Sequence, residues 1–191
     1  MNTSNIKKYA PQARNDFIAA MRKQAAKYGI TADSILPAEQ KGDLLLIGDQ
    51  VFPLSVMKPR EKLIKRIQTS SFEQTIDYIA YSWFNRLCAI RYMECKGLLD
   101  HGRRVLSSAD GSAGLPQILE ECLDIDLPGL NASRVAELKL DGNKDEELYR
   151  ELLLAQCHAL NQVMPLLFEQ VSDESELLLP DNLTKTDSLI R

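Results

Sequence analysis

The sequence lacks the apolar and cysteine-based features that mark membrane, secreted and zinc-binding proteins. No apolar run is long enough for a helix that crosses a membrane. The opening residues, MNTSNIKKYAPQ, lack the apolar core of a secretory signal peptide. No C-x-x-C pair occurs, which argues against structural zinc, and the cysteines stand far apart at Cys88, Cys95, Cys122 and Cys157. We therefore expect a cytoplasmic protein whose cysteines are reduced and lie in its core.

The short motifs that carry nucleotide binding and hydrolysis are also missing. The sequence has no G-x-G-x-x-G and no G-x-S-x-G pattern, and its GSAG stretch at 111–114 is typical of a flexible loop. The two histidines, His101 and His158, are far apart and have no partnered nucleophile or metal-ligand set. No catalytic, cofactor-binding or metal-binding residue is therefore predicted within residues 1–191.

What the sequence does have is a strong charge asymmetry. Residues 1–104 hold 17 Lys and Arg against 10 Asp and Glu, whereas residues 105–191 hold 6 against 17. Such asymmetry is compatible with a first half that faces an anion such as nucleic acid. It is also compatible with two halves that attract each other or are simply solvated, and charge alone favours this second interpretation.

Hydrophobic periodicity predicts a mainly α fold, an irregular helical bundle with a small β-hairpin near residues 44–54. Pro53 limits its strand to a sheet edge or to a position where no hydrogen-bond donor is needed. Ser70 or Ser71 is expected to cap the central helix, with Ser70 and Glu73 at the spacing of a capping box. A loop over 103–115, with a short strand at 105–106, separates the central helix from those that follow. Helices are predicted over 5–28, 58–68, 71–96, 115–123, 133–138 and 144–170, the last breaking before Pro165.

These elements divide the chain into two parts, 1–68 and 69–191. The first holds a basic helix, the hairpin and a short basic helix. The second is a helical bundle around the helix 71–96. In its tail, the apolar run Leu177–Leu179 has no sustained period and is expected to need a partner surface. The ending at Arg191 looks like a cut within something longer.

The central helix is apolar around most of its circumference, yet it carries Arg86 and Arg91. A buried guanidinium must be paired because an isolated buried charge is very costly. Arg91 can reach Glu94 at i+3, and Arg86 is expected to pair with a carboxylate from the acidic second half. These three residues are therefore predicted to form structural ion pairs. The alternative places one arginine at the helix edge, against a phosphate.

Several blocks of the sequence together resemble one known family. YSWFNRLCAIRYMECKGLLDHGRRVLSS (81–108) is similar to a signature of the PglX family of adenine-specific DNA methyltransferases from BREX phage-defence systems. IKKYAPQARNDFI (6–18) resembles the start of these proteins. LYRELLLAQCHALNQVMPLLFE (148–169) and ELLLPDNLTKTDSLIR (176–191) resemble later blocks in the same order. The resemblance therefore covers essentially the whole chain.

The resemblance implies a much longer parent enzyme that transfers a methyl group from S-adenosylmethionine to adenine N6. Its methyl-donor fold and its Asn-Pro-Pro-Tyr motif lie beyond this region, and the present sequence contains no Asn-Pro-Pro. A target adenine would have to be flipped into a pocket lined by aromatic and amide groups. The chain is thus expected to be an N-terminal region without catalytic motifs.

Two roles are open for such a region. The first is a scaffold that packs on the rest of the methyltransferase chain, or meets other BREX proteins or an acidic phage-encoded inhibitor. Leu177–Leu179 and the edge hairpin favour this role. The second is a module that contacts the backbone of double-stranded DNA without reading its sequence. The residues expected to contact DNA or a partner are Lys7, Lys8, Arg14, Arg22, Lys23, Arg60, Lys62, Lys65 and Arg66.

Overall fold

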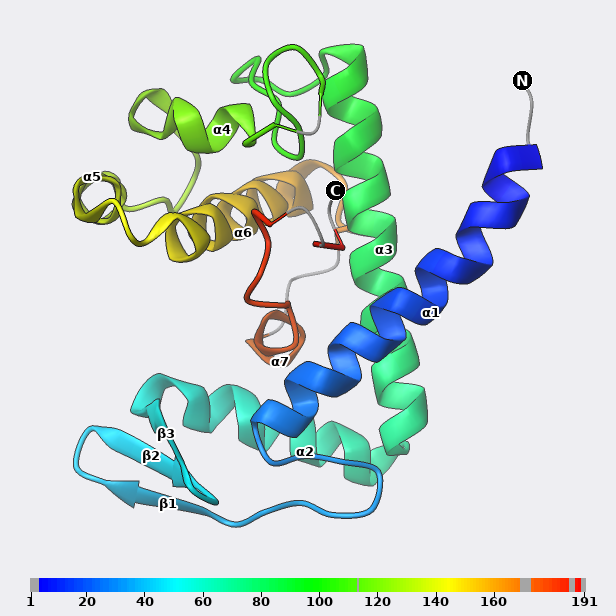
Figure 1. The fold of residues 1–191 in the computed structure, drawn as a ribbon, viewed down its shortest axis with the longest axis vertical. Helices are drawn as coiled ribbons and strands as arrows, with labels where there is room; N and C mark the ends of the chain where they lie inside the picture. Colours follow the sequence, from blue (N-terminus) through cyan, green and yellow to red (C-terminus); the bar gives the residue numbers. More distant parts are fainter. Residues whose placement is uncertain (1–3, 113, 169–172, 186–187, 190–191) are drawn as a thin grey trace. The chain divides into compact units, whose positions relative to one another are not determined.

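The chain folds into helices and one small antiparallel sheet (Figure 1), which confirms the mainly α class predicted from periodicity. The computed structural model describes residues 4–112, 114–168, 173–185 and 188–189, without the side chains of residues 4–8 and 173. Two compact units are present: residues 1–83 with 172–180, and residues 84–171 with 181–191. The central helix spans residues 83 and 84, where the chain passes from the first unit to the second. The predicted division into 1–68 and 69–191 stays a prediction.

In the first unit, helix α1 (Ser4–Lys27) presents a narrow apolar stripe to the core. Ala13, Phe17, Met21 and Ala25 recur every fourth residue and are all buried, as an amphipathic helix requires. Gly29 follows the helix with φ of 69°. A Cβ atom at this position would lie 2.6 Å from Cγ2 of Ile47, so only glycine fits both the backbone and the space.

The predicted hairpin is part of a three-stranded antiparallel sheet in the order β1-β2-β3. Its strands are β1 (Ala38–Lys41), β2 (Leu44–Ile47) and β3 (Gln50–Pro53). Leu45 pairs with Phe52 in the register, and both are buried. Pro53 lies in an edge strand, where its missing N–H breaks no ladder. Strand β1 was not predicted because its sequence, AEQK, is exposed throughout and has no apolar alternation.

Two adjacent serines separate the helices that follow the sheet and the short 3₁₀ turn η1 (Leu54–Val56). Helix α2 (Met57–Thr69) ends at Ser70, whose Oγ donates to the carbonyl of Arg66 at 3.0 Å. Helix α3 (Phe72–Lys96) begins after Ser71, whose Oγ accepts from the N–H of Gln74 at 3.2 Å. Ser71 therefore caps α3, and the capping box predicted from Ser70 to Glu73 is wrong.

The apolar run of the tail packs within the first unit, to which residues 172–180 belong. Helix α7 (Asp173–Leu177) contacts α2, and Leu177, Leu178 and Leu179 are all buried. Trp83 Nε1 donates to the carbonyl of Ser175 at 2.9 Å. The expected partner surface is present, and it comes from residues about 100 positions earlier in the same chain, so this run does not favour an external partner.

The second unit is built on the end of α3 and on helix α6 (Asp145–Val163), which ends two residues before Pro165. Helices α4 (Gln117–Glu120) and α5 (Ala132–Asp141) contact α6, and the 3₁₀ turn η2 (Cys122–Asp124) lies between them. Residues 103–115 include no strand at 105–106, contrary to expectation. Val105 and Leu106 are nevertheless buried, and the Glu94 side chain accepts hydrogen bonds from their backbone N–H groups.

Candidate functional site

The basic residues of α1 face an acidic edge of α3 in the first unit. Arg14 Nη2 lies 3.1 Å from Asp77 Oδ2, and the Arg22 guanidinium pairs with Glu73. These pairs border an open groove of about 430 Å³ whose lining consists of Arg14, Asn15, Ile18, Ala19, Arg22, Glu73 and Asp77. The lining has as many carboxylates as guanidinium groups, so the groove offers no excess positive charge to a phosphate backbone.

Arg60 stands apart from the other predicted contact residues because it is buried, with 4% of its surface exposed. Its Nε donates to the carbonyl of Tyr28 at 2.8 Å, and its Nη2 donates to the carbonyl of Leu36. Burial lowers the pKa of the Arg60 guanidinium, and Glu61 partly offsets this effect. Arg60 therefore ties the segment after α1 to α2, and we remove it from the set of candidate phosphate contacts.

Arg66 is held by the tail of the first unit. Its Nη1 lies 3.3 Å from Glu174 Oε1, and its guanidinium carbon lies 4.2 Å from the centre of the Tyr78 ring. An ion pair and a cation–π contact together fix this side chain in one orientation. Of the predicted set, Lys23 on α1, and Lys62 and Lys65 on α2, are exposed, as are the ion-paired Arg14 and Arg22 on α1. The side chains of Lys7 and Lys8 lie outside the described part of the chain.

Once the tail is counted with the first unit, that unit is no longer basic. Residues 1–83 and 172–180 contain 12 Lys and Arg and 11 Asp and Glu, which gives a net charge of +1. The second unit contains 11 and 16, a net charge of −5. Residues 1–83 alone carry a net charge of +4, which Asp173, Glu174 and Glu176, distant in sequence, reduce to +1, while residues 84–104, with a further +3, belong to the second unit.

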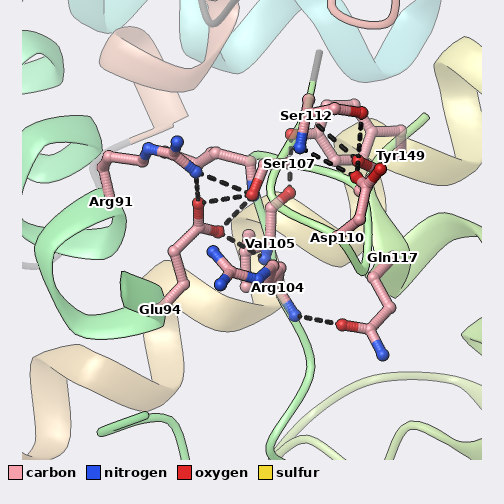
Figure 2. Close-up of polar contacts among 11 residues, drawn as sticks. Arg91, Glu94, Arg104, Val105, Ser107, Asp110, Ser112, Gln117 and Tyr149 are labelled. Atoms are coloured by element: carbon pink, nitrogen blue, oxygen red, sulfur yellow. Dashed lines mark hydrogen bonds and ion pairs between the residues drawn. The ribbon is translucent and has the colours of Figure 1, made fainter. Parts of the chain in front are cut away.

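The second unit contains a polar network centred on a buried carboxylate, Glu94 (Figure 2). Arg91 Nη1 forms an ion pair with Glu94 Oε1 and donates to Ser107 Oγ at 2.7 Å. The N–H groups of Val105 and Leu106 both donate to Glu94 Oε2 at 2.8 Å, and Ser107 Oγ donates to Oε1 at 2.9 Å. Glu94 thus satisfies buried backbone donors that no strand partner satisfies.

Arg86 is buried in the same unit, with 2% of its surface exposed. The structure therefore places it inside the fold instead of at a helix edge facing solvent. Its expected pairing with a carboxylate from the acidic half stays a prediction. Of the two central arginines, Arg91 is the one that reaches the surface, with 46% of its side chain exposed.

The loop that contains Glu94's partners is held by further hydrogen bonds. Tyr149 Oη, from α6, donates to the carbonyl of Val105 at 2.9 Å, and the N–H of Arg104 donates to Gln117 Oε1 at 3.0 Å (Figure 2). His101 Nε2 lies 2.7 Å from Gln156 Oε1, and its Nδ1 accepts from the N–H of Arg103. These contacts hold the loop against α6 and give His101 a structural partner set.

We expect Tyr149→Phe to lower the free energy of unfolding by about 1–2 kcal/mol, because the buried Val105 carbonyl loses its hydroxyl donor. Urea unfolding followed by far-UV circular dichroism measures this difference. Tyr92→Phe, which removes an exposed hydroxyl from α3, is the matched control and should change stability by less than about 0.5 kcal/mol. Equal unfolding midpoints for the two variants would contradict this role of Tyr149.

Asp110 organises the exposed turn of the same loop. Its Oδ1 accepts from Ser108 Oγ and from the N–H of Ser112, which lies 2.8 Å away. These hydrogen bonds, with that of Ser108 first, lower the pKa of Asp110 to about 2. Because the folded pKa lies below the unfolded one, Asp110 stabilises the turn above about pH 4. That contribution is lost as the pH falls through about 2.

Carboxyl carbon NMR should therefore show Asp110 titrating with a midpoint of about 2. Ser108→Ala should move this midpoint upward, towards the ordinary value for aspartate, because it removes the largest cause of the shift. Ser133→Ala, an exposed serine on α5, should leave it unchanged. A wild-type midpoint near the ordinary value would show that the turn does not form in solution.

The cysteines are divided between core and surface. Cys122 and Cys157 are buried, whereas Cys88 and Cys95 are exposed on α3. The expectation that the cysteines lie in the core is therefore wrong for Cys88 and Cys95. That expectation rested on how often cysteine is buried in general. Both positions lie opposite the buried face of the central helix, which was itself predicted. Burial raises the pKa of the Cys122 thiol, and partial burial also raises the pKa of the Cys88 thiol.

Among the described residues, no group of His, Cys, Asp and Glu side chains could hold a metal ion. None of the described helices is long and apolar enough to cross a membrane. The arrangements that the structure does show are ion pairs and hydrogen bonds that fix loops and helix ends. Their chemistry is that of structural support.

Comparison with known proteins places this region within much longer chains. No family model matches the chain. The adenine-specific methyltransferase BrxX of Escherichia coli O9:H4 (strain HS) is 52% identical over 198 aligned positions, which cover 100% of this chain and 16% of BrxX. The adenine-specific methyltransferase PglX of Lacticaseibacillus casei (strain Zhang) is 30% identical over 197 positions, which cover 93% of this chain and 16% of PglX.

The chain thus spans about a sixth of the length of the curated relatives that it matches. The match runs along the whole chain in one order, as the blocks that resembled the family did. At 52% identity, two sequences share a fold and a common origin. The chain belongs to the PglX family of adenine-specific methyltransferases, of which it matches the N-terminal part.

Proposed function

We propose that residues 1–191 are the N-terminal helical region of an S-adenosylmethionine-dependent methyltransferase that modifies adenine N6 in DNA and acts in BREX phage defence. The observation that carries this proposal is the 52% identity to BrxX along the whole chain. The methyl donor and the flipped adenine would be bound outside these residues. This region would support the chemistry without taking part in it.

Within such an enzyme, the region acts as a scaffold. Its helices and loops are joined by fixed contacts, such as those from Arg60 on α2 to the carbonyls of Tyr28 and Leu36. Arg14, Arg22 and Arg66 each have a carboxylate partner within the first unit. The partners of a scaffold of this kind are the rest of the methyltransferase chain and other BREX proteins.

A second role, contact with the DNA backbone, is favoured by the exposure of Lys23, Lys62 and Lys65. Exposed ion pairs such as Arg14–Asp77 contribute only about 0–1 kcal/mol, so a phosphate could compete for these arginines. An acidic phage-encoded inhibitor would meet the same surface. The net charge of +1 on the first unit nevertheless provides little long-range attraction to a polyanion.

Fluorescence anisotropy with a labelled duplex distinguishes the two roles. For a scaffold, we expect the chain alone to bind duplex DNA with a Kd weaker than about 100 µM at about 150 mM salt. For a DNA-contacting module, binding at low salt would be tight. Lys23→Ala/Lys65→Ala would then reduce the slope of log K against log salt by about 2, at about 0.9 per phosphate. Lys41→Ala/Lys96→Ala removes the same charge elsewhere and serves as the control.

The proposed chemistry is tested separately with labelled S-adenosylmethionine. A polypeptide that joins residues 1–191 to the catalytic region should transfer label to adenine in duplex DNA. Residues 1–191 alone should transfer none and should bind no methyl donor in a calorimetric titration. Binding of the methyl donor by the chain alone would overturn the assignment of the chemistry to residues outside it.

A further inference from the structure

One face of α3 in the second unit remains uncovered although its residues are not those of a solvated helix. Cys88, Tyr92 and Cys95 follow one another at spacings of four and three. With 100° of rotation per residue, these side chains lie within an arc of about 60°. All three are exposed, and 61% of Tyr92 is accessible to solvent. We name these residues the cysteine–tyrosine stripe.

The opposite face of the same helix is already occupied by the core of the unit. Arg86, Leu87, Ile90 and Glu94 are buried there, and Glu94 binds the loop over 105–107. The cysteine–tyrosine stripe is therefore not part of the core of this unit. An outward helix face is normally charged or polar, and cysteine is among the residue types that are most often buried. The stripe contains no charged side chain, although Arg91 and Lys96 stand at its margins.

We propose that the cysteine–tyrosine stripe is the surface on which the remaining part of the same methyltransferase polypeptide docks. This inference rests on the proposed function and names the contact that the scaffold uses. The relatives match 100% and 93% of this chain but extend far beyond it, because the matched part is 16% of each. Most of such a protein therefore lies outside these residues and is tethered to them at high effective concentration.

The composition of the stripe suits a protein partner better than a nucleic acid. Aromatic residues are enriched and charged residues depleted at the centre of protein interfaces. A phosphate backbone would instead require the Lys and Arg residues that the stripe lacks. A tethered partner also explains why two thiols can be presented on a helix surface, since they would be covered in the whole enzyme.

The native cysteines provide the test, because Cys88 and Cys95 lie in the stripe while Cys122 and Cys157 are buried in the same unit. N-ethylmaleimide is applied to residues 1–191 and to the full polypeptide, and each cysteine-containing peptide is quantified by mass spectrometry. Partial burial raises the pKa of the Cys88 thiol, so labelling is done at about pH 8.5 to supply thiolate. We expect Cys88 and Cys95 to be labelled in the chain alone and at least about tenfold more slowly in the full polypeptide. Cys122 and Cys157 should be protected in both.

Tyr92→Lys provides a second measurement that does not depend on thiol chemistry alone. In the full polypeptide this variant should restore labelling of Cys88 and Cys95, because a charge in the contact weakens docking. Tyr9→Lys, at a tyrosine with the same 61% exposure on α1, is the matched control and should leave both thiols protected. Circular dichroism of each variant establishes that α3 is still folded.

Equal labelling of Cys88 and Cys95 in the chain alone and in the full polypeptide would overturn the proposal. Protection in the chain alone that grows with its concentration would also overturn it, since the occupant would then be a second copy. Methyl transfer by the full polypeptide is measured in the same preparation. Protection without methyl transfer would support the docking surface and reject the proposed function. Methyl transfer without protection would support the proposed function and reject the docking surface.

Discussion

Glu94→Ala should lower the free energy of unfolding by about 3–5 kcal/mol, because it removes a fully buried carboxylate that several groups share. The substitution leaves the N–H groups of Val105 and Leu106 without their acceptor in a buried environment. It also removes the ion-pair partner of Arg91 and the acceptor of the Ser107 hydroxyl. Urea unfolding monitored by circular dichroism measures the change.

Two further variants separate this role of Glu94 from a general effect of lost charge. Glu120→Ala removes an exposed carboxylate from α4 of the same unit and should change stability by less than about 0.5 kcal/mol. Glu94→Gln keeps the shape of the side chain but places an N–H₂ where one oxygen accepts, and it should fall between wild type and Glu94→Ala. If Glu94→Ala unfolds at the wild-type midpoint, the network in Figure 2 does not form in solution.

Arg60→Ala should lower the free energy of unfolding by about 3 kcal/mol, because a buried guanidinium donates to two backbone carbonyls there. These carbonyls, of Tyr28 and Leu36, would lose charge-assisted hydrogen bonds, and a cavity would replace the side chain. Thermal and urea unfolding of the variant both measure the loss.

Lys65→Ala, on the same helix, is the control for Arg60→Ala, because it removes the same charge from an exposed position. It should be neutral to within about 0.5 kcal/mol. The contrary result would be an Arg60→Ala variant as stable as wild type that binds duplex DNA less well. Arg60 would then belong with the phosphate-contacting residues from which the structure separates it.

The elements that could be predicted from the sequence are those whose signal is local. Apolar residues from Ala13 to Ala25 recur at helical spacing and predicted α1. The i+3 spacing from Arg91 to Glu94 predicted their ion pair. Strand β1 has no such signal, since AEQK is exposed throughout and is defined only by its pairing with β2. Prediction therefore succeeded where the pattern and the contact lie within the same few turns.

The candidate site shows the same limit more strongly. Glu94 was predicted to pair with Arg91, and its other partners, at 105–107, come from a loop whose path no helical period describes. Arg66 was expected to be available to DNA, but it pairs with Glu174, which lies 108 positions later in the sequence and has no local signal. Charge counted along the chain predicted a basic first half, but the fold divides residues 1–104 between two units and adds the acidic residues of 173–176 to the first unit.

We propose that this region supports an adenine methyltransferase without contacting the DNA backbone. The most direct test is the KM for duplex DNA of the full polypeptide carrying Lys23→Ala/Lys65→Ala. The account predicts a KM within about twofold of wild type, with an unchanged kcat. A rise in KM of about tenfold or more, in a variant that unfolds at the wild-type temperature, would show that these helices hold the DNA backbone and would contradict the account.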